Sequence, residues 1–258
     1  MKSENKKAYV YYALAVLTAL VAWFLLPQLI AGKELTLTAF YGMNALQQIF
    51  LLAVPALLIL RGREARWQRF CRQIKPLDTE ILGYIMLGTV ACTMVASLII
   101  SFWLPIVERT AGQVPELPPF PEPKTALQWI AAVVCIGIIP GFTEELFFRG
   151  VLQTVLSRRF PRAGIVIAAV IFALLHLDIA SFPGLVFMGF LLGKLYERRG
   201  MMASGTFHGL YNLVVLVLNN AGTDIGFLEI FLCIVAFRFA INRLMREDES
   251  HAADGAGV

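Results

Sequence analysis

The sequence predicts an all-α, polytopic membrane protein, and three observations support this fold class. Hydrophobic residues make up 58% of the 258 residues and the mean hydropathy is +0.71, which leaves too few polar side chains to cover a soluble domain of this size. The hydrophobic residues are gathered in runs of roughly 20, the length that crosses about 30 Å of hydrocarbon. The basic residues are divided unequally between the loops that join these runs.

The hydrophobic runs predict about eight transmembrane helices. They lie near residues 8–31, 38–60, 81–106, 126–148, 164–180, 181–197, 201–219 and 225–243. Lysines precede the first run, but it is long and no small-residue cleavage site follows it. We therefore expect a retained first helix rather than a removed signal peptide.

The distribution of basic residues predicts the orientation of the chain. If the N-terminus is cytoplasmic, 18 of the 22 Lys and Arg residues face the cytoplasm and only Lys33, Arg109 and Lys124 lie outside, with Arg149 in or beside a span. This bias follows the positive-inside rule and requires an even number of spans, so both termini should be cytoplasmic. The net charge of +4 therefore reports topology, and we expect no nucleic-acid partner.

The chain is predicted to form one membrane domain with three regions. Residues 1–125 hold the N-terminal helices and two longer loops, residues 126–244 hold the remaining helices, and residues 245–258 form a polar tail that we expect to be disordered. The loop 61–80 has the pattern of a basic amphipathic helix on the membrane surface, where topological anchoring is expected and substrate docking is the alternative. The proline-rich loop 107–125 should be an extended external segment.

Three formal charges lie in or just below the fourth predicted span. Glu144, Glu145 and Arg149 follow Pro140, which cannot donate a backbone hydrogen bond and so kinks the helix or opens it to a cavity. An ionisable side chain in a bilayer costs roughly 2.5–3.5 kcal/mol on insertion scales, so such residues need a reason. A functional site is one reason, and a buried charge cluster or an interfacial flank is the other.

Helix geometry separates the two glutamates. Glu145 and Arg149 are four residues apart, so they share a helix face and can form an ion pair. Glu144 points about 100° away from Glu145 and about 140° away from Arg149. We therefore predict a structural pair, Glu145 with Arg149, and a freer carboxylate at Glu144.

Two of the three histidines, His176 and His208, lie within predicted spans. A single membrane histidine is more often a hydrogen-bonded packing residue than a catalyst, but two histidines with a Glu-Glu pair favour a site. His208 and Asn212 are four residues apart and should offer a ring nitrogen and an amide to a common point. Gly-x-x-x-Gly pairs flank these positions and indicate close helix packing.

Three ordered motifs carry a resemblance to a known family. They are Glu144-Glu145-x-x-x-Arg149, then Phe172-x-x-x-His176, then His208-x-x-x-Asn212, each on a separate predicted span. In this order they resemble the motifs of the CAAX-protease and bacteriocin-processing (CPBP, or Abi) intramembrane peptidases. The resemblance covers residues 144–212 and implies an eight-helix fold with its catalytic core in residues 126–244.

The resemblance implies a role for each motif residue. Glu144 and His176 would activate the attacking water, His208 and Asn212 would stabilise the oxyanion, and Glu145 and Arg149 would hold the site in shape with Phe172 beside them. From the residues alone a second scheme stays open, because one carboxylate and two histidines also make a catalytic zinc set, here Glu144, His176 and His208. No cofactor is required by the sequence, and zinc remains a candidate.

The expected activity is hydrolysis of a peptide bond in a membrane-associated substrate, of the CAAX type or in a peptide precursor. Peptide hydrolysis needs a base for water and donors for the oxyanion, and this residue set supplies both. The expected partners are a membrane-associated peptide or protein and the lipid bilayer. The short loops and simple termini favour a bacterial inner (plasma) membrane.

Other functions fit the sequence less well. The chain lacks the His-Glu-x-x-His, Gly-x-Ser-Gly and paired-aspartate patterns of other intramembrane proteases. A proton-coupled transporter would use the same buried residues, but it predicts an internal repeat and none is evident. A non-catalytic scaffold or immunity protein predicts decay of the motifs, which are intact.

Overall fold

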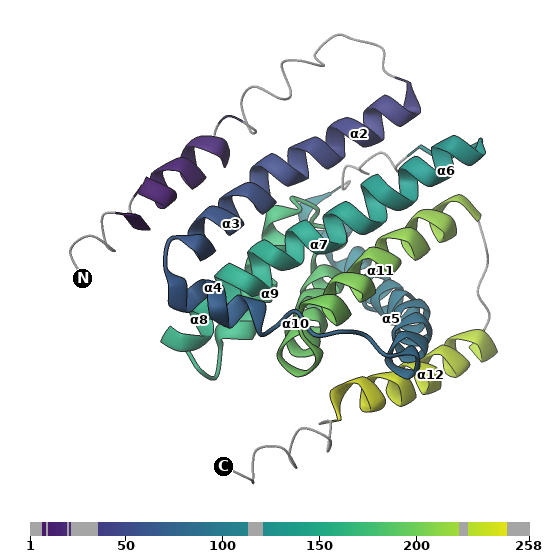
Figure 1. Cartoon of the computed structure of the whole chain (residues 1–258). Coiled ribbons are helices and arrows are strands. Elements are labelled where there is room, and N and C mark those ends of the chain that lie inside the picture. The colour runs from purple at the N-terminus through teal and green to yellow at the C-terminus, as the bar shows by residue number, and fades with distance from the viewer. Residues whose placement is uncertain are drawn as a thin grey trace.

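The computed structural model describes residues 7–8, 10–19, 21, 36–112, 121–221 and 227–246. Throughout these residues every regular element is a helix, and the described part of the chain contains no strand (Figure 1). The predicted all-α class is therefore confirmed. The N-terminal helical segment Val10–Ala19 lies beside the helical rod Leu37–Arg61 (Figure 1).

Several elements join end to end into longer helical rods, in which π-helical segments (η) alternate with α-helices. In chain order the elements are α2 (Leu37–Gln48), η1 (Ile49–Ala53), α3 (Val54–Arg61), α4 (Glu64–Cys71), α5 (Thr79–Ala111), α6 (Ala126–Ala132), η2 (Val133–Ile138), α7 (Ile139–Glu145), η3 (Leu146–Gln153), α8 (Thr154–Arg159), α9 (Gly164–Leu175), α10 (Phe182–Arg199), α11 (Met201–Ala221) and α12 (Phe227–Met245).

Four helical rods in the described residues are long and apolar enough to cross a membrane. They are Leu37–Arg61, Thr79–Thr110, Ala126–Arg159 and Met201–Leu218. They match the predicted runs 38–60, 81–106, 126–148 and 201–219, although the third continues for eleven residues beyond the predicted end. The chain is thus an integral membrane protein by the length and composition of these helices.

The other four predicted runs do not form helices of that kind within the described residues. In the first run the described helix is only Val10–Ala19, and α9 is a 12-residue helix that ends before the predicted boundary. α10 has 18 residues, but four of its last six are charged. α12 carries three charged residues along its length. Hydropathy alone therefore does not give the lengths of these helices.

The loop predicted over 107–125 is only partly a loop. α5 continues to Ala111 and contains Pro105 within it, so the start of the predicted extended segment is helical. Residues 113–120 lie outside the described part, and residues 121–124 are non-helical. The Tyr41 hydroxyl of α2 donates to the carbonyl of Pro121, which connects this segment to the rod Leu37–Arg61. In the predicted tail, residues 247–258 also lie outside the described part.

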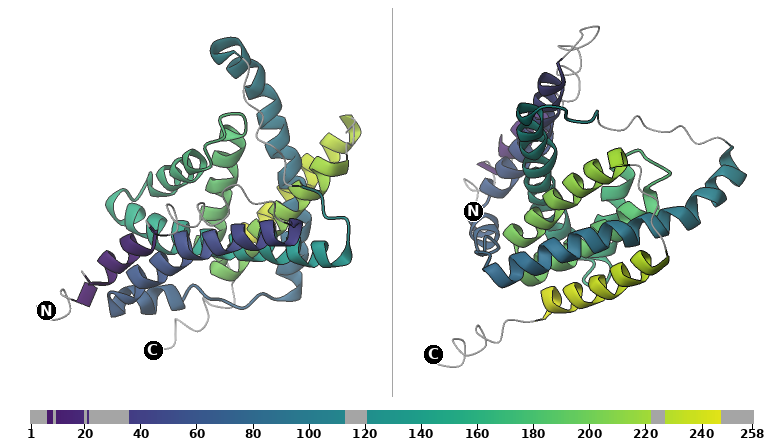
Figure 2. Two further views of the ribbon diagram at one scale, coloured as in Figure 1. Left: turned by 90° about the horizontal axis from the view of Figure 1, so that it is seen from above. Right: turned by 90° about the vertical axis from the view of Figure 1, so that its right-hand side faces the viewer.

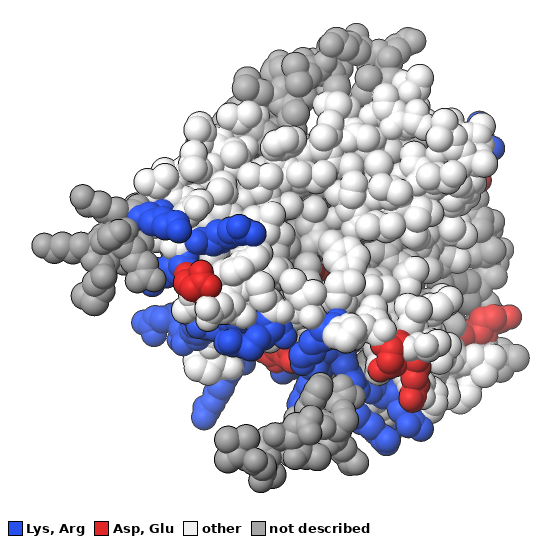
Figure 3. Space-filling view, viewed as in Figure 1, with Lys and Arg blue, Asp and Glu red and all other residues white. Residues whose placement is uncertain are grey.

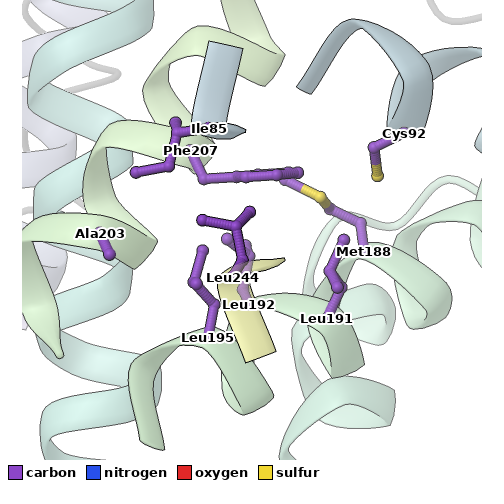
Figure 4. Packing of buried hydrophobic residues seen from close by; sticks show 9 residues of the cluster. All are labelled: Ile85, Cys92, Met188, Leu191, Leu192, Leu195, Ala203, Phe207 and Leu244. Atoms are coloured by element: carbon purple, nitrogen blue, oxygen red, sulfur yellow. The ribbon is translucent and has the colours of Figure 1, made fainter. Parts of the chain in front are cut away.

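The largest hydrophobic core joins α5, α10, α11 and α12 (Figure 4). α12 packs against α5, and the right-hand view of Figure 2 shows the two helices side by side. Phe207 of α11 and Met188 of α10 are almost fully buried there. The core residues are Ile85, Cys92, Met188, Leu191, Leu192, Leu195, Ala203, Phe207 and Leu244. This core fixes α10 and α11, which contribute to the site described below.

The predicted amphipathic helix forms, but it packs against the protein. α4 covers Glu64–Cys71, and its Phe70 is 7% exposed in a cluster with Leu60 of α3 and Leu146 of η3. The Arg61 guanidinium lies over the Trp67 ring at 4.4 Å. α4 thus covers the ends of two candidate spans with its apolar face, because that face finds a protein surface to pack on.

Candidate active site

The two glutamates end α7, inside the rod Ala126–Arg159. Glu144 is 7% exposed, Glu145 is 0% exposed and Arg149 is 1% exposed, so all three charges are buried. Arg149 Nη1 lies 3.1 Å from Glu145 Oε1, which is the ion pair that their spacing predicts. The π-helical segment η3 begins directly after Glu145, and π-helical turns are frequent at functional sites.

Backbone carbonyls of α10 accept hydrogen bonds from polar side chains of η3. Arg149 Nη2 donates to the Gly189 carbonyl at 3.0 Å, and Gln153 Nε2 donates to the Gly193 carbonyl at 3.1 Å. A Cβ on Gly193 would lie 2.6 Å from Gln153 Oε1. The predicted close packing at this Gly-x-x-x-Gly pair is therefore real, and it brings the α10 backbone within reach of Arg149.

His208 lies between the two carboxylates. Its Nδ1 is 3.1 Å from Glu145 Oε1 and its Nε2 is 3.7 Å from Glu144 Oε2. Because an ionised carboxylate cannot donate, Nδ1 is the donor to Glu145. At 3.7 Å the second contact is too long for a hydrogen bond, so Nε2 has none with Glu144.

Glycines allow α11 to bring His208 this close. A Cβ on Gly141 of α7 would lie 2.7 Å from the backbone nitrogen of Gly209 and 2.8 Å from the carbonyl oxygen of Gly205. These are backbone atoms, which cannot give way, so α7 and α11 touch here through main chain alone. The Gly205 and Gly209 pair around His208 therefore packs closely, as its spacing predicts.

Gln48 is a site residue that sequence reasoning missed. It is the last residue of α2, and its Nε2 donates to Glu144 Oε1 at 2.9 Å. The π-helical segment η1 begins directly after it, as η3 does after Glu145. A signal was available, because Gln47-Gln48 is a polar pair inside an apolar run. Nothing in the spacing, however, connects that pair to a glutamate on another span.

His176 lies at the end of a helix rather than within one. α9 ends at Leu175, and His176 is its C-terminal cap residue, followed by Leu177 in the left-handed region with φ of 54°. The His176 Nδ1 donates to the Phe172 carbonyl at 2.8 Å, because a carbonyl oxygen can only accept. The predicted run 164–180 is therefore not helical throughout, and His176 lies just beyond the end of its helix. The ring is exposed, and its Nε2 is left for another partner.

Phe172 connects the parts of the site. Its ring is 1% exposed and lies 4.6 Å from the His176 ring and 5.7 Å from the His208 ring, centroid to centroid. The Arg149 guanidinium lies 4.9 Å from the same ring. A buried aromatic ring in this place contacts the guanidinium and both imidazoles and helps to hold them in position.

Asn212 contacts the backbone of the neighbouring rod. Its Nδ2 donates to the Ile136 carbonyl at 3.2 Å. Four residues later Pro140 has no N–H to offer that carbonyl, so the Asn212 amide replaces the missing helix hydrogen bond. The predicted meeting of His208 and Asn212 at a common point is not seen here, because each side chain is engaged with a different group.

Glu144 and His176 open onto one large apolar cavity of about 950 Å³. Its other lining residues are mostly apolar and come from the N-terminal helical segment, α2, η1, α3, α4, η3, the end of α9 and the turn after it. They are Tyr12, Ala15, Val16, Ala19, Gln48, Leu51, Leu52, Pro55, Ile59, Arg66, Phe147, Phe148, Leu175 and Leu177. Glu145, Arg149, His208 and Asn212 lie behind this wall and do not line the cavity.

One carboxylate oxygen of Glu144 has no hydrogen-bond partner in the described part of the chain. Among the described residues Glu144 Oε2 is buried and has no hydrogen-bond partner, whereas Oε1 accepts from Gln48. Glu145 uses its Oε1 for both Arg149 and His208, and its Oε2 is likewise buried without a hydrogen-bond partner among the described residues. The predicted pair of Glu145 with Arg149 is therefore present, and Glu144 differs from Glu145 in lining the cavity.

The candidate zinc ligands do not form a metal site in this arrangement. Over the described ranges, no three His, Cys, Asp or Glu side chains gather so that they could hold a metal ion. Glu144, His176 and His208 therefore do not fit a zinc set here, and the chemistry below uses side chains alone.

Fold and site together define an integral membrane protein of helices with a buried carboxylate-histidine centre beside an apolar cavity. A family model described as type II CAAX prenyl endopeptidase Rce1-like matches residues 126–214. The match confirms the resemblance to the CPBP family and indicates a CAAX-type protease over a segment that holds every predicted site residue. No curated protein and no solved structure matches the chain.

Proposed function

We propose that this protein is an intramembrane endopeptidase that hydrolyses a peptide bond of a membrane-associated substrate with a water activated by Glu144. The observation that carries the proposal is that Glu144 and His176 line one apolar cavity of about 950 Å³. Such a cavity holds an apolar substrate anchor next to a carboxylate that has a free oxygen. The matched family supplies the class of reaction.

Glu144 acts as the general base. Its Oε1 is held by Gln48, so Oε2 is the oxygen that takes a proton from water as the water oxygen attacks the carbonyl carbon. The proton then passes from Glu144 to the leaving nitrogen as the C–N bond breaks. The products are a carboxylic acid and an amine, and Glu144 is again ionised.

We assign His176 to the attacking water and His208 to the oxyanion. His176 donates Nδ1–H to a backbone carbonyl, so its Nε2 is available to hold the attacking water. His208 Nε2 lies 3.7 Å from Glu144 Oε2, and we assign His208 to the oxyanion. Because Nδ1–H is given to Glu145, His208 can donate from Nε2 only as the imidazolium, and the substrate carbonyl must reach past Glu144, since His208 does not line the cavity. Asn212 is assigned a structural role, since its amide is engaged with Ile136.

Glu145 and Arg149 hold His208 and η3 in place. Glu145 Oε1 accepts from His208 and faces Arg149, and Arg149 continues to the α10 backbone. This chain of contacts runs through residues that are at most 3% exposed, which keeps it apart from bulk water. It positions the imidazole and leaves Glu144 to react.

The apolar cavity wall and the distribution of basic residues support proposals for the substrate class and for the membrane topology. We propose a substrate with an apolar membrane anchor, either CAAX-type or a peptide precursor, because the cavity wall is mostly apolar. We also propose eight membrane crossings with both termini cytoplasmic, from the 18-to-3 bias of basic residues. Residues 126–244 form the catalytic core, and a bacterial inner membrane is the proposed location.

The test is cleavage of a panel of membrane-anchored peptides by purified full-length protein in liposomes. Glu144→Gln and His176→Ala should each lower the rate by at least 100-fold, in line with the ~10²–10⁴ that a general base contributes. Glu80→Gln, an exposed carboxylate on α5, is the matched control and should cleave like the wild type. Equal cleavage by the Glu144 variant and the control would disprove the proposed mechanism.

A further inference from the structure

A second, smaller pocket lies where two candidate spans end. The rods Leu37–Arg61 and Ala126–Arg159 both end beside it, and α4 covers it from the side. Its volume is about 70 Å³. The lining residues are Ile59, Leu60, Arg66, Arg69, Phe70, Gln73, Gly150, Val151, Thr154, Val155, Arg158 and Tyr196. None of the proposed catalytic residues is among them.

The rim of this pocket is basic and its floor is apolar. Arg66, Arg69 and Arg158 contribute three guanidinium groups from α4 and α8. Within the described part of the chain, no carboxylate lies within ion-pair distance of Arg69 or Arg158. Three positive charges gathered around one small hollow with no counter-charge repel one another, so an anion placed between them is stabilised.

Two further contacts show that the pocket is built rather than incidental. Arg66 Nη1 donates to the Tyr12 hydroxyl and its guanidinium lies 5.5 Å from the Tyr12 ring, so Arg66 is held in place. The floor is packed, because a Cβ on Gly150 would lie 3.3 Å from the Phe70 ring.

The position of the pocket sets its depth in a membrane. Rods that cross the hydrocarbon end near the lipid headgroups, and this pocket lies at the ends of two of them. Figure 3 shows Lys and Arg gathered at this end of the molecule, over α3, α4 and α8, while the face above is nearly free of charge. Arg66 and Ile59 line both this pocket and the large apolar cavity, so the two adjoin.

We propose that this basic pocket binds the phosphate of an anionic phospholipid headgroup. Arginine forks match phosphate oxygens in paired hydrogen bonds, and basic pockets between membrane helices at this depth suit anionic headgroups. An apolar floor that adjoins an apolar cavity gives the acyl chains a continuous surface, which a free phosphate would not use. The inference is independent of the proposed peptidase activity, because it concerns different residues and a binding event.

The experiment measures lipid binding by the full-length protein in a neutral detergent, by native mass spectrometry and by the shift in Tm. Phosphatidylglycerol should bind saturably and raise Tm, whereas phosphatidylcholine at the same concentration should bind at least ten-fold more weakly. Inorganic phosphate, used as the second probe, should compete only at concentrations at least 100-fold higher. If free phosphate binds as tightly as the anionic lipid, the lipid half of the proposal is wrong.

A charge-matched pair of variants separates a site from a charged surface. Arg69→Gln with Arg158→Gln removes two pocket arginines and should weaken phosphatidylglycerol binding at least ten-fold. Arg72→Gln with Arg159→Gln removes two charges from the same stretches of chain outside the pocket, and should bind like the wild type. Equal weakening by both pairs would overturn the proposal. If the first pair does not fold, Arg158→Gln alone, at an exposed position, is measured against Arg159→Gln.

Discussion

At the scale of single residues, the main problem is how a membrane protein buries an arginine. Arg149 is 1% exposed and receives three compensations, from Glu145, from the Gly189 carbonyl and from the Phe172 ring. Removing one partner of a buried pair leaves a charge without compensation, which costs about 3–5 kcal/mol. The glutamate that lines the cavity has no such task.

This difference predicts opposite effects of the two neighbouring glutamates. Glu145→Ala or Arg149→Ala should lower the free energy of unfolding by about 3–5 kcal/mol and reduce activity through loss of structure. Glu144→Gln should abolish cleavage and lower the free energy of unfolding by less than about 1.5 kcal/mol, because the glutamine oxygen can still accept from Gln48. Thermal and denaturant unfolding in detergent, followed by circular dichroism, measures both. Equal losses of stability in all three variants would contradict the division of roles.

Gln48 gives a second residue-scale prediction. Its amide is a hydrogen-bond donor to a charged group, a contact worth about 1.5–3 kcal/mol. Gln48→Ala should therefore lower kcat by about ten-fold or more, because Glu144 is no longer held. Gln47→Ala, the neighbour on the same helix, is the control and should keep its kcat. A change in KM alone would show that Gln48 contacts substrate and does not position the base.

The sequence predicted some of these residues better than others. The Glu145–Arg149 pair follows from helix periodicity, since i, i+4 spacing holds even though a π-helical segment begins between them. The Gln48 contact joins two distant parts of the chain, and no local rule connects them. The position of His176 depends on where α9 ends, and an apolar run does not mark that end.

At the scale of elements, π-helical segments and glycines bring the site together. η1 starts after Gln48 and η3 starts after Glu145, so both residues lie at a change of helical twist. Gly141 meets the backbone of α11 at Gly205 and Gly209, which brings His208 to the carboxylates. Pro140, which sequence analysis expected to kink or open the helix, lies within a continuous rod whose lost hydrogen bond Asn212 replaces.

The proline and the asparagine form a pair that a double-mutant cycle tests. Asn212→Ala should cost about 1–3 kcal/mol, because the Ile136 carbonyl is left buried without a donor. In a Pro140→Ala background residue 140 has an N–H, so the same Asn212→Ala change should cost much less. An oxyanion role for Asn212 would give a different result: lost kcat whatever stands at position 140, with no coupling in the unfolding free energy.

Hydropathy gave the elements with unequal accuracy. The rods in the second, third, fourth and seventh runs were predicted to within a few residues at their N-terminal ends. α5 was predicted too short, because the helix continues past Pro105 into a segment assigned to the proline-rich loop. α4 was predicted as a helix, but its packing on Leu60 and Leu146 depends on tertiary contacts that an amphipathic pattern does not specify.

At the scale of the whole molecule, the unequal distribution of basic residues along the sequence corresponds to a basic surface at one end. Lys and Arg gather at one end of the molecule (Figure 3), the end at which the rods Leu37–Arg61 and Ala126–Arg159 both finish. The active-site cavity and the basic pocket adjoin near this end through Ile59 and Arg66.

A native cysteine tests the proposed orientation. Cys71 ends α4 on the basic side and is exposed, whereas Cys92 is buried and Cys135 and Cys233 are partly buried within helices. A membrane-impermeant maleimide should label Cys71 in inside-out vesicles and not in right-side-out ones, because the proposed topology places the basic side in the cytoplasm. Cys71→Ser should lose the signal. Labelling of Cys71 from outside would reverse the topology.

The proposal that Glu144 activates water in this cavity without a metal can be tested in a single experiment. Single-turnover cleavage of a membrane-anchored peptide is followed for the wild type and for Glu144→Gln, before and after chelation, with the metal content determined on the same samples. Wild-type cleavage should be unchanged by the chelator at metal contents far below one per chain, and Glu144→Gln should cleave at least 100-fold more slowly. Cleavage that stops on chelation and returns with added zinc would contradict it.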